Sequence, residues 1–217
     1  GASAWTLYVM HHVTPLTVDL EAQRLFDWLD SPWLAHASLL LAMIGDKAGI
    51  VALVSPWACW LLVVKRFDAL LHGALALGGI ALINTAGKAL FARARPTTPD
   101  HLTGSYAYPS AHTSTWVVMI GLAAAVMAAR LPRQRRAWVY WMAIVVTLPM
   151  ALSRLALGVH WLSDLVGGAL MGLVVCALVQ LNWQRRYRAP LPAIPWVSLT
   201  GASLLLVSAR MLLFGPV

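Results

Sequence analysis

The sequence predicts an all-α membrane protein, a polytopic helical bundle with six transmembrane helices and an N-terminal pair of interfacial helices. The composition indicates an integral membrane protein, because 60% of the 217 residues are hydrophobic and 11% are charged. Mean hydropathy is +0.72, whereas a soluble domain is nearer half apolar and a quarter charged. The length suits six spans of roughly 20 residues each. Helices are expected because an open sheet cannot satisfy its backbone in lipid.

Residues 1–46 form the predicted N-terminal region, which is less apolar than the rest and holds five of the eight acidic residues. Between residues 17 and 30, apolar side chains recur on one helical face, and Asp19 falls in the first turn, where the helix dipole favours an acid. Pro32 restarts a helix, and Gly45 ends it. We therefore expect two helices that lie in the membrane interface and do not cross the bilayer.

Six apolar runs follow and form the predicted six-span domain, residues 47–217. Connections on one side of the membrane carry nine basic residues and one acid. They are Lys65, Arg66, Arg130, Arg133, Arg135, Arg136, Arg185, Arg186 and Arg188, with Asp68. The positive-inside rule places this side in the cytoplasm. We place the spans at 48–64, 69–92, 113–130, 137–153, 161–182 and 193–214.

Span parity then brings the unusual polar residues together on the opposite, outer side. Lys88 ends the second span, His112 begins the third, Arg154 ends the fourth, and His160 and Asp164 begin the fifth. Charged groups at such depth are costly and mark functional sites. The active site is therefore predicted within residues 88–164.

The local spacings indicate phosphate chemistry. His160 and Asp164 are four positions apart and can meet, and a carboxylate on one imidazole nitrogen leaves the other nitrogen free to react. The stretch Pro109-Ser110-Ala111-His112 opens a helix, whose free N–H groups suit an anion. Lys88 and Arg95 are seven positions apart and share a face if the helix continues that far. Together these groups predict a phosphate site with a nucleophile and a proton donor.

Each fragment has a simpler interpretation when it is taken alone. Lys88 could be a lysine that snorkels from a helix end, and the pair of His160 and Asp164 could be structural. A lone His112 is more often a satisfied histidine than a catalytic one. The functional interpretation rests on all the fragments meeting on one side of the membrane.

These residues resemble the type 2 phosphatidic acid phosphatase superfamily, which also includes glucose-6-phosphatase and the vanadium haloperoxidases. That family has the motifs K-x6-R-P, P-S-G-H and S-R-x5-H-x3-D. They occur here in order as Lys88…Arg95-Pro96, Pro109-Ser110-Ala111-His112 and Ser153-Arg154…His160…Asp164. One position departs from the pattern, because Ala111 stands where the family usually has glycine. Alanine keeps the backbone N–H but disfavours a positive φ.

The resemblance implies a role for each matched position. His160 is the nucleophile that forms a phosphohistidine, Asp164 orients it, and His112 acts first as the general acid and then as the base. Phosphoryl oxygens are bound by Lys88, Arg95 and Arg154, helped by the Ser110 hydroxyl and the Ala111 N–H. No metal or other cofactor is expected, since three cations supply the charge that phosphoryl transfer requires.

The resemblance and the residues together predict an integral membrane lipid phosphate or diphosphate phosphatase. It would hydrolyse the phosphomonoester or pyrophosphate of a membrane lipid, such as undecaprenyl diphosphate, phosphatidylglycerol phosphate or phosphatidate. We expect it in the cell inner (plasma) membrane as a multi-pass protein, with the site facing the periplasm. The alternatives are a lipid phosphotransferase that uses the same phosphohistidine, a non-enzymatic lipid transporter or scramblase, and an idle membrane anchor. Transport would favour charges at the midplane and an inverted repeat.

The expected partners are the phosphorylated lipid and the bilayer. Nucleic acid is not expected despite the net charge of +8, because the basic residues cluster in short loops that suit anionic headgroups. The sequence leaves the oligomeric state open. The chain begins with Gly1, so we expect “GAS” to be a cloning remnant or the cut edge of a longer protein with an upstream domain.

Overall fold

A computed structural model of the chain describes residues 4–6, 15–186 and 191–215; parts of the predicted N-terminal region and Arg188 lie outside these ranges. The described residues form helices and no strands, which confirms the all-helical prediction. The longer helices are α2 (Thr17–Trp28), α3 (Pro32–Gly45), α4 (Lys47–Val63), α5 (Phe67–Phe91), α6 (Ala111–Ala129), α7 (Arg133–Ala156), α8 (Leu162–Arg186) and α9 (Trp196–Phe214). A short 3-10 helix, η1 (Asp100–Leu102), lies in the loop between α5 and α6.

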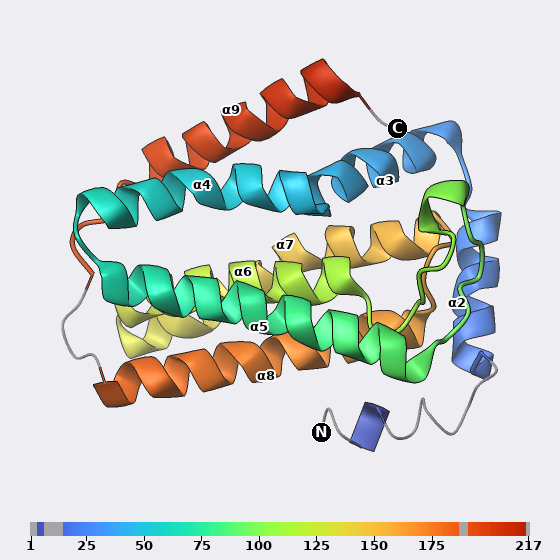
Figure 1. Cartoon of the computed structure of the whole chain (residues 1–217), viewed down its shortest axis with the longest axis horizontal. Coiled ribbons are helices and arrows are strands. Elements are labelled where there is room, and N and C mark those ends of the chain that lie inside the picture. Colours follow the sequence, from blue (N-terminus) through green and yellow to red (C-terminus); the bar gives the residue numbers. More distant parts are fainter. Residues whose placement is uncertain (1–3, 7–14, 187–190, 216–217) are drawn as a thin grey trace.

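The helices from α4 to α9 run roughly along the long axis of the bundle, and α2 runs across one end of them (Figure 1). Within the described chain, the helices α5, α6, α7, α8 and α9 are each long and apolar enough to cross a membrane. The pair of α3 and α4 also passes this test, with a bend of 57° between its two parts, and counts as a sixth span if it is one broken helix. The predicted polytopic helical bundle is therefore confirmed.

The two predicted N-terminal helices are present, but they are oriented differently from each other. α2 runs across the end of the bundle, whereas α3 meets α4 at a bend of 57° and packs on α7 (Figure 1). The break between α3 and α4 lies at Asp46, whose side chain accepts the Gly49 N–H at 2.7 Å and so caps the start of α4. α3 belongs to a span only if it and α4 form one broken helix, so its interfacial placement stays a prediction. The domain division at residue 47 stays a prediction.

The connections sort to two ends of the bundle (Figure 1). One end carries the loop 92–110, the turn between α7 and α8, and α2; we call it the site end. The opposite end carries the α4–α5, α6–α7 and α8–α9 connections, and we call it the basic end. This separation agrees with the one that span parity predicts.

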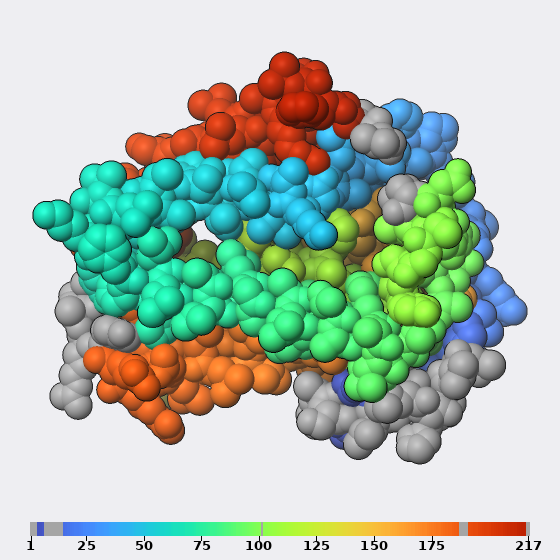
Figure 2. Space-filling view, viewed as in Figure 1, coloured from blue at the N-terminus to red at the C-terminus, as the bar shows by residue number. Residues whose placement is uncertain are grey.

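The core of the bundle lies between α5, α6 and α8, where Ala76, Ile80, Val118 and Val175 are buried against one another. At the site end α8 approaches the start of α6 so closely that a Cβ on Gly168 would lie 2.6 Å from the Ser110 carbonyl oxygen. Only glycine permits this approach. On the face formed by α3, α4 and α5, the surface is hollowed between α4 and α5, above α6 (Figure 2).

Candidate active site

The predicted site residues come together at the site end of the bundle. Lys88 lies in the last turn of α5, Arg154 in the last turn of α7 and Asp164 in the first turn of α8. His112 is the second residue of α6, and His160 precedes α8 in the turn after α7. The charges of Arg154 and Lys88 and the ring of His160 all lie near enough to act on His112. Four helices thus bring one polar cluster together.

His160 and Asp164 meet as the spacing predicts. The Nδ1 of His160 lies 3.4 Å from Oδ2 of Asp164, and both side chains are almost fully buried. This distance exceeds that of a good hydrogen bond, and within the described structure Nδ1 has no hydrogen-bond partner. Asp164 Oδ2 instead accepts the Trp161 N–H at 2.8 Å. The contact is therefore electrostatic, and it leaves Nε2 as the nitrogen that faces Arg95.

The environment of His160 keeps its imidazole neutral. Burial lowers the pKa of His160 to about 4, although the neighbouring Asp164 opposes this shift. The His160 Nε2 lies 3.3 Å from Nη1 of Arg95. A neutral imidazole whose free nitrogen faces a guanidinium has the arrangement that a nucleophile beside an anion-binding group requires.

Lys88 and Arg95 are brought together by a different route from the one expected. α5 ends at Phe91, and Ala92 adopts a left-handed conformation with φ 43°, so the helix does not continue to Arg95. Both side chains instead donate to the carbonyl oxygen of Tyr106, Arg95 at 3.0 Å. The loop between α5 and α6 therefore folds back over the helix end and directs both cations toward the cluster.

Arg154 is the clearest sign of an anion site. The residue is 5% exposed, and its Nε and Nη2 have no hydrogen-bond partner among the residues that the structure describes. Burying an ion is costly unless it is paired and hydrogen-bonded. A guanidinium presents its donors as a planar fork that matches two oxygens of a phosphate. Arg154 thus lies in the cluster with free hydrogen-bond donors, which a bound phosphoryl group would satisfy.

The motif at the start of α6 is built as the sequence predicts. α6 begins at Ala111 with Ser110 at the N-cap, and the Ser110 N–H donates to the Asp164 carbonyl at 3.2 Å. This bond ties the second motif to the third. Ala111 is not among the described residues with a positive φ. An alanine therefore fits this backbone without the strain that would call for glycine.

His112 contacts α3, which sequence reasoning did not place in the site. Its Nε2 lies 3.3 Å from the carbonyl oxygen of Ala42. A Cβ on Gly45 would lie 2.7 Å from Cδ2 of the ring and 2.8 Å from Sδ of Met150. The break between α3 and α4 therefore forms one wall of the site. Gly45, which the sequence marks only as a helix end, is the residue that lets the ring fit.

A second buried charge network was also missed. Arg93 donates from Nη1 to Asp164 Oδ1 at 2.6 Å and to Ser163 Oγ at 2.6 Å, and from Nη2 to Asp19 Oδ2 at 2.7 Å. From the sequence, Asp19 is expected to act on the helix dipole from the first turn of α2, but in the structure its side chain is fully buried. A signal was present, since Asp19 shares a helical face with Ala22 and Phe26. An acid on an apolar face indicates a buried partner.

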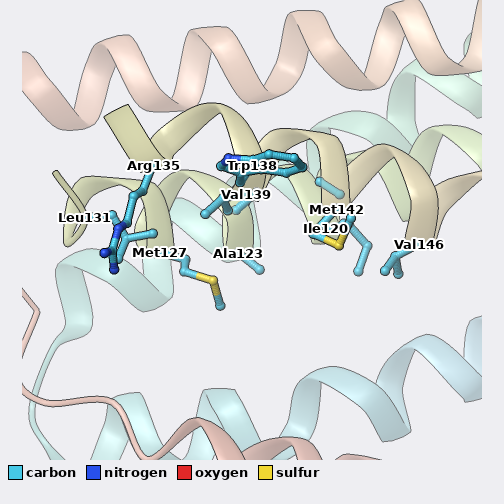
Figure 3. A pocket seen from close by; sticks show the side chains of 11 residues that line it. Ile120, Ala123, Met127, Leu131, Arg135, Trp138, Val139, Met142 and Val146 are labelled. Carbon is cyan, nitrogen blue, oxygen red and sulfur yellow. The ribbon is translucent and has the colours of Figure 1, made fainter. Parts of the chain in front are cut away.

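The other notable features lie apart from this cluster or add no ligand set to it. A pocket of about 570 Å³ lies between α6 and α7, with Arg135 at one end and Val146 at the other, and its other labelled residues are mostly apolar (Figure 3). None of the predicted site residues lines it. Within the described ranges, no three His, Cys, Asp or Glu side chains are grouped so that they could hold a metal ion.

A family model and two known sequences are similar to this chain. The family model described as the PAP2 superfamily matches residues 69–188, more than half of the chain. Phosphatidylglycerophosphatase B of Bacillus subtilis (strain 168) is 27% identical over 153 residues, covering 69% of this chain and 75% of that protein. A putative undecaprenyl-diphosphatase, YbjG of Escherichia coli (strain K12), is 27% identical over 162 residues, covering 71% and 76%.

Two solved structures share the fold. A transmembrane PAP2-type phosphatidylglycerolphosphate phosphatase from Bacillus subtilis superposes with a TM-score of 0.73 at 24% identity, covering 86% of this chain and 96% of that one. LpxE of Aquifex aeolicus superposes with a TM-score of 0.56 at 20% identity, covering 76% and 96%. At these identities the likeness supports the helical architecture.

Proposed function

This chain belongs to the PAP2 superfamily, and from that premise we propose that it is a membrane phosphatase acting on the phosphomonoester or diphosphate of a lipid. The observation that carries the proposal is the buried Arg154, whose unsatisfied donors lie in one cluster with His112 and His160. The relatives support a lipid substrate, because one is named for phosphatidylglycerophosphate and the other for undecaprenyl diphosphate.

In the proposed reaction, Nε2 of His160 attacks phosphorus and forms a nitrogen–phosphorus bond while the bond from phosphorus to the leaving oxygen breaks. His112 gives a proton to that oxygen. In the second half, water attacks phosphorus, His112 takes a proton from the water, and the electrons of the nitrogen–phosphorus bond return to Nε2. Inorganic phosphate is released, and both histidines regain their starting states.

The remaining residues act by charge and position. Asp164 faces Nδ1, where positive charge develops when His160 is phosphorylated. Lys88, Arg95 and Arg154 bind the phosphoryl oxygens, because the transferring group spreads negative charge over them. The Ser110 hydroxyl and the Ala111 N–H lie at the start of α6, where the helix dipole favours an anion. Three cations supply what a metal pair supplies elsewhere, so the proposed enzyme works without a divalent metal.

The test is phosphate release by purified protein from a panel of phosphatidate, phosphatidylglycerol phosphate and undecaprenyl diphosphate, with excess chelator present. We expect release from at least one lipid and inhibition by vanadate, whose five-coordinate form resembles the phosphorus attacked by His160. His160→Gln should be inactive. His36→Gln, which changes an exposed histidine on α3, is the matched control.

Two results would contradict the proposal. Release from none of the lipids by folded protein means that the phosphatase assignment is wrong. Activity that is lost in chelator and restored by magnesium means that the cations have been assigned the wrong role.

A further inference from the structure

Asp19 is a carboxylate of the N-terminal helix α2 that lies within the catalytic cluster. It is 0% exposed and belongs to no part of the segment that matches the family, residues 69–188. Its Oδ1 accepts the Ser163 N–H at 2.8 Å. Its Oδ2 accepts the Ser163 hydroxyl at 2.8 Å, Nη2 of Arg93 at 2.7 Å and the Leu16 N–H at 3.0 Å. Four hydrogen bonds at one buried carboxylate fix its position.

Asp19 and Asp164 share one guanidinium. Nη2 of Arg93 bonds Asp19 at 2.7 Å, and Nη1 bonds Asp164 at 2.6 Å, with all three side chains at most 4% exposed. Two carboxylates and one cation leave this group with a net negative charge. The other oxygen of Asp164 faces His160. The excess negative charge therefore lies next to the nucleophile.

We propose that Asp19 is a positioning residue of the catalytic centre, which holds Ser163 and one side of Arg93 so that Asp164 is fixed against His160 and keeps its charge available to it. This rests on the proposed function. When Nε2 attacks phosphorus, the imidazole becomes a cation whose charge is shared with Nδ1, 3.4 Å from Asp164. Without Asp19, the whole charge of Arg93 would act on Asp164, and the phosphorylated imidazolium would lose stabilisation in this low-dielectric site.

The experiment compares wild type with Asp19→Asn, which has nearly the same shape but no charge. In rapid-quench measurements with a radiolabelled lipid phosphate, Asp19→Asn should slow formation of the phosphoenzyme by on the order of tenfold. KM should stay within about threefold, because Asp19 does not touch the substrate. Dephosphorylation should not slow, because a less stable phosphoimidazolium reacts at least as readily. A loss of correctly folded protein would instead lower the amount of phosphoenzyme formed and leave both rate constants unchanged.

A double variant and a control sharpen the result. The double variant Asp19→Asn with Arg93→Gln removes one charge of each sign, so that Asp164 interacts with His160 and no longer with a guanidinium. The rate of phosphoenzyme formation should therefore recover part of what Asp19→Asn loses. If the double variant does not fold, the decision rests on Asp19→Asn. Asp68→Asn is the control, because it also breaks an Arg–Asp pair but at the basic end, and both steps should proceed as in wild type.

A spectroscopic readout separates this proposal from the phosphatase assignment. Nitrogen-15 spectra of labelled histidine at neutral pH, assigned with His160→Gln, should show a proton on Nδ1 of His160 in wild type. Asp19→Asn should shift part of the population to the Nε2–H tautomer. This holds even if no lipid is hydrolysed, in which case the function alone fails. Unchanged spectra and unchanged phosphoenzyme formation in Asp19→Asn would overturn the positioning role.

Discussion

A neutral nucleophile in a cationic cluster makes the rate depend on pH in a particular direction. Burial lowers the pKa of His160 to about 4, below the ordinary histidine value of about 6.5. Protonation removes the nucleophile, so loss of activity begins as pH falls through the lowered value. We expect kcat/KM to lose nothing to His160 protonation between pH 7 and about 5 and to fall below that range. A loss that tracks a histidine titrating near its ordinary pKa would contradict this.

The measurement needs a substrate whose phosphate does not itself titrate in the range. A diphosphate and a monophosphate lipid should therefore be compared, since only a loss common to both belongs to the enzyme. The melting temperature at each pH separates protonation of His160 from unfolding.

Replacing Arg154 should lower activity and raise the stability of the folded protein. Its buried Nε and Nη2 have no protein partner in the described part of the chain, so replacing it with an apolar side chain of similar length removes a desolvation cost. Arg154→Met should stabilise the folded protein by about 1 kcal/mol and lower phosphate release by at least about a hundredfold, as expected when a group that binds the transition state is lost. Thermal denaturation and phosphate release measure the two effects.

Arg154→Lys tests the fork geometry, because lysine keeps the charge but cannot bind two oxygens at once. It should fall between wild type and Arg154→Met in activity. If Arg154→Met is clearly less stable than wild type, the arginine is structural and the anion site must be sought among the other cations.

At the level of helices, the break between α3 and α4 should control the general acid. A Cβ on Gly45 would lie 2.7 Å from His112 Cδ2, closer than carbon atoms approach in folded proteins, so Gly45→Ala must move the ring or the break. We expect this variant to retain its helices but lose at least about tenfold in kcat, because His112 is displaced by a fraction of an ångström or more. Steady-state kinetics with circular dichroism measure this.

Gly73→Ala is the matched control for that substitution. Gly73 lies inside α5, and a Cβ there would meet nothing within 4 Å. It should leave kcat unchanged and stabilise α5 slightly, by about 0.5 kcal/mol. Equal activity of both variants would show that the α3–α4 break does not position His112.

The helices show which features a sequence can reveal and which it cannot. Apolar runs predict the spans because the lipid requires apolar side chains there. They mark the part of a helix inside the membrane and not where the helix begins. α7, for example, starts at Arg133, whereas the predicted span starts at residue 137. The charged turn 133–136 is helical outside the apolar region. α3 is apolar whether it lies flat or along the bundle, and its place is decided by its contacts with α7.

The contacts of the site likewise divide into those that the sequence predicts and those that it does not. Lys88, His112, Arg154, His160 and Asp164 were predictable because their spacings and the span parity carry them to one end. The parts that were missed are contacts between segments far apart in the chain: Asp19 with Arg93, and Ala42 with His112. Neither has a local spacing that reveals it.

For the whole molecule, the separation of the two ends indicates how the protein sits in the membrane. The basic end carries Arg130 at the end of α6 and Arg133, Arg135 and Arg136 in the first turn of α7. At the site end, Arg93 is paired with buried acids and Arg154 is buried in the polar cluster. The orientation is therefore expected to follow the basic loops, which stay on the cytoplasmic side.

The last prediction tests this orientation in intact cells with a membrane-impermeant thiol reagent. Cys59 and Cys176 are first replaced, because Cys59 is exposed. Thr103→Cys, in the loop at the site end, should label, and Arg133→Cys, at the start of α7, should label only after the cells are opened. Opened cells serve as the control that both thiols are reachable. The reverse pattern would place the site in the cytoplasm, where it could act only on lipid phosphates of the inner leaflet; the expected pattern limits the substrate to lipids whose phosphate reaches the outer leaflet.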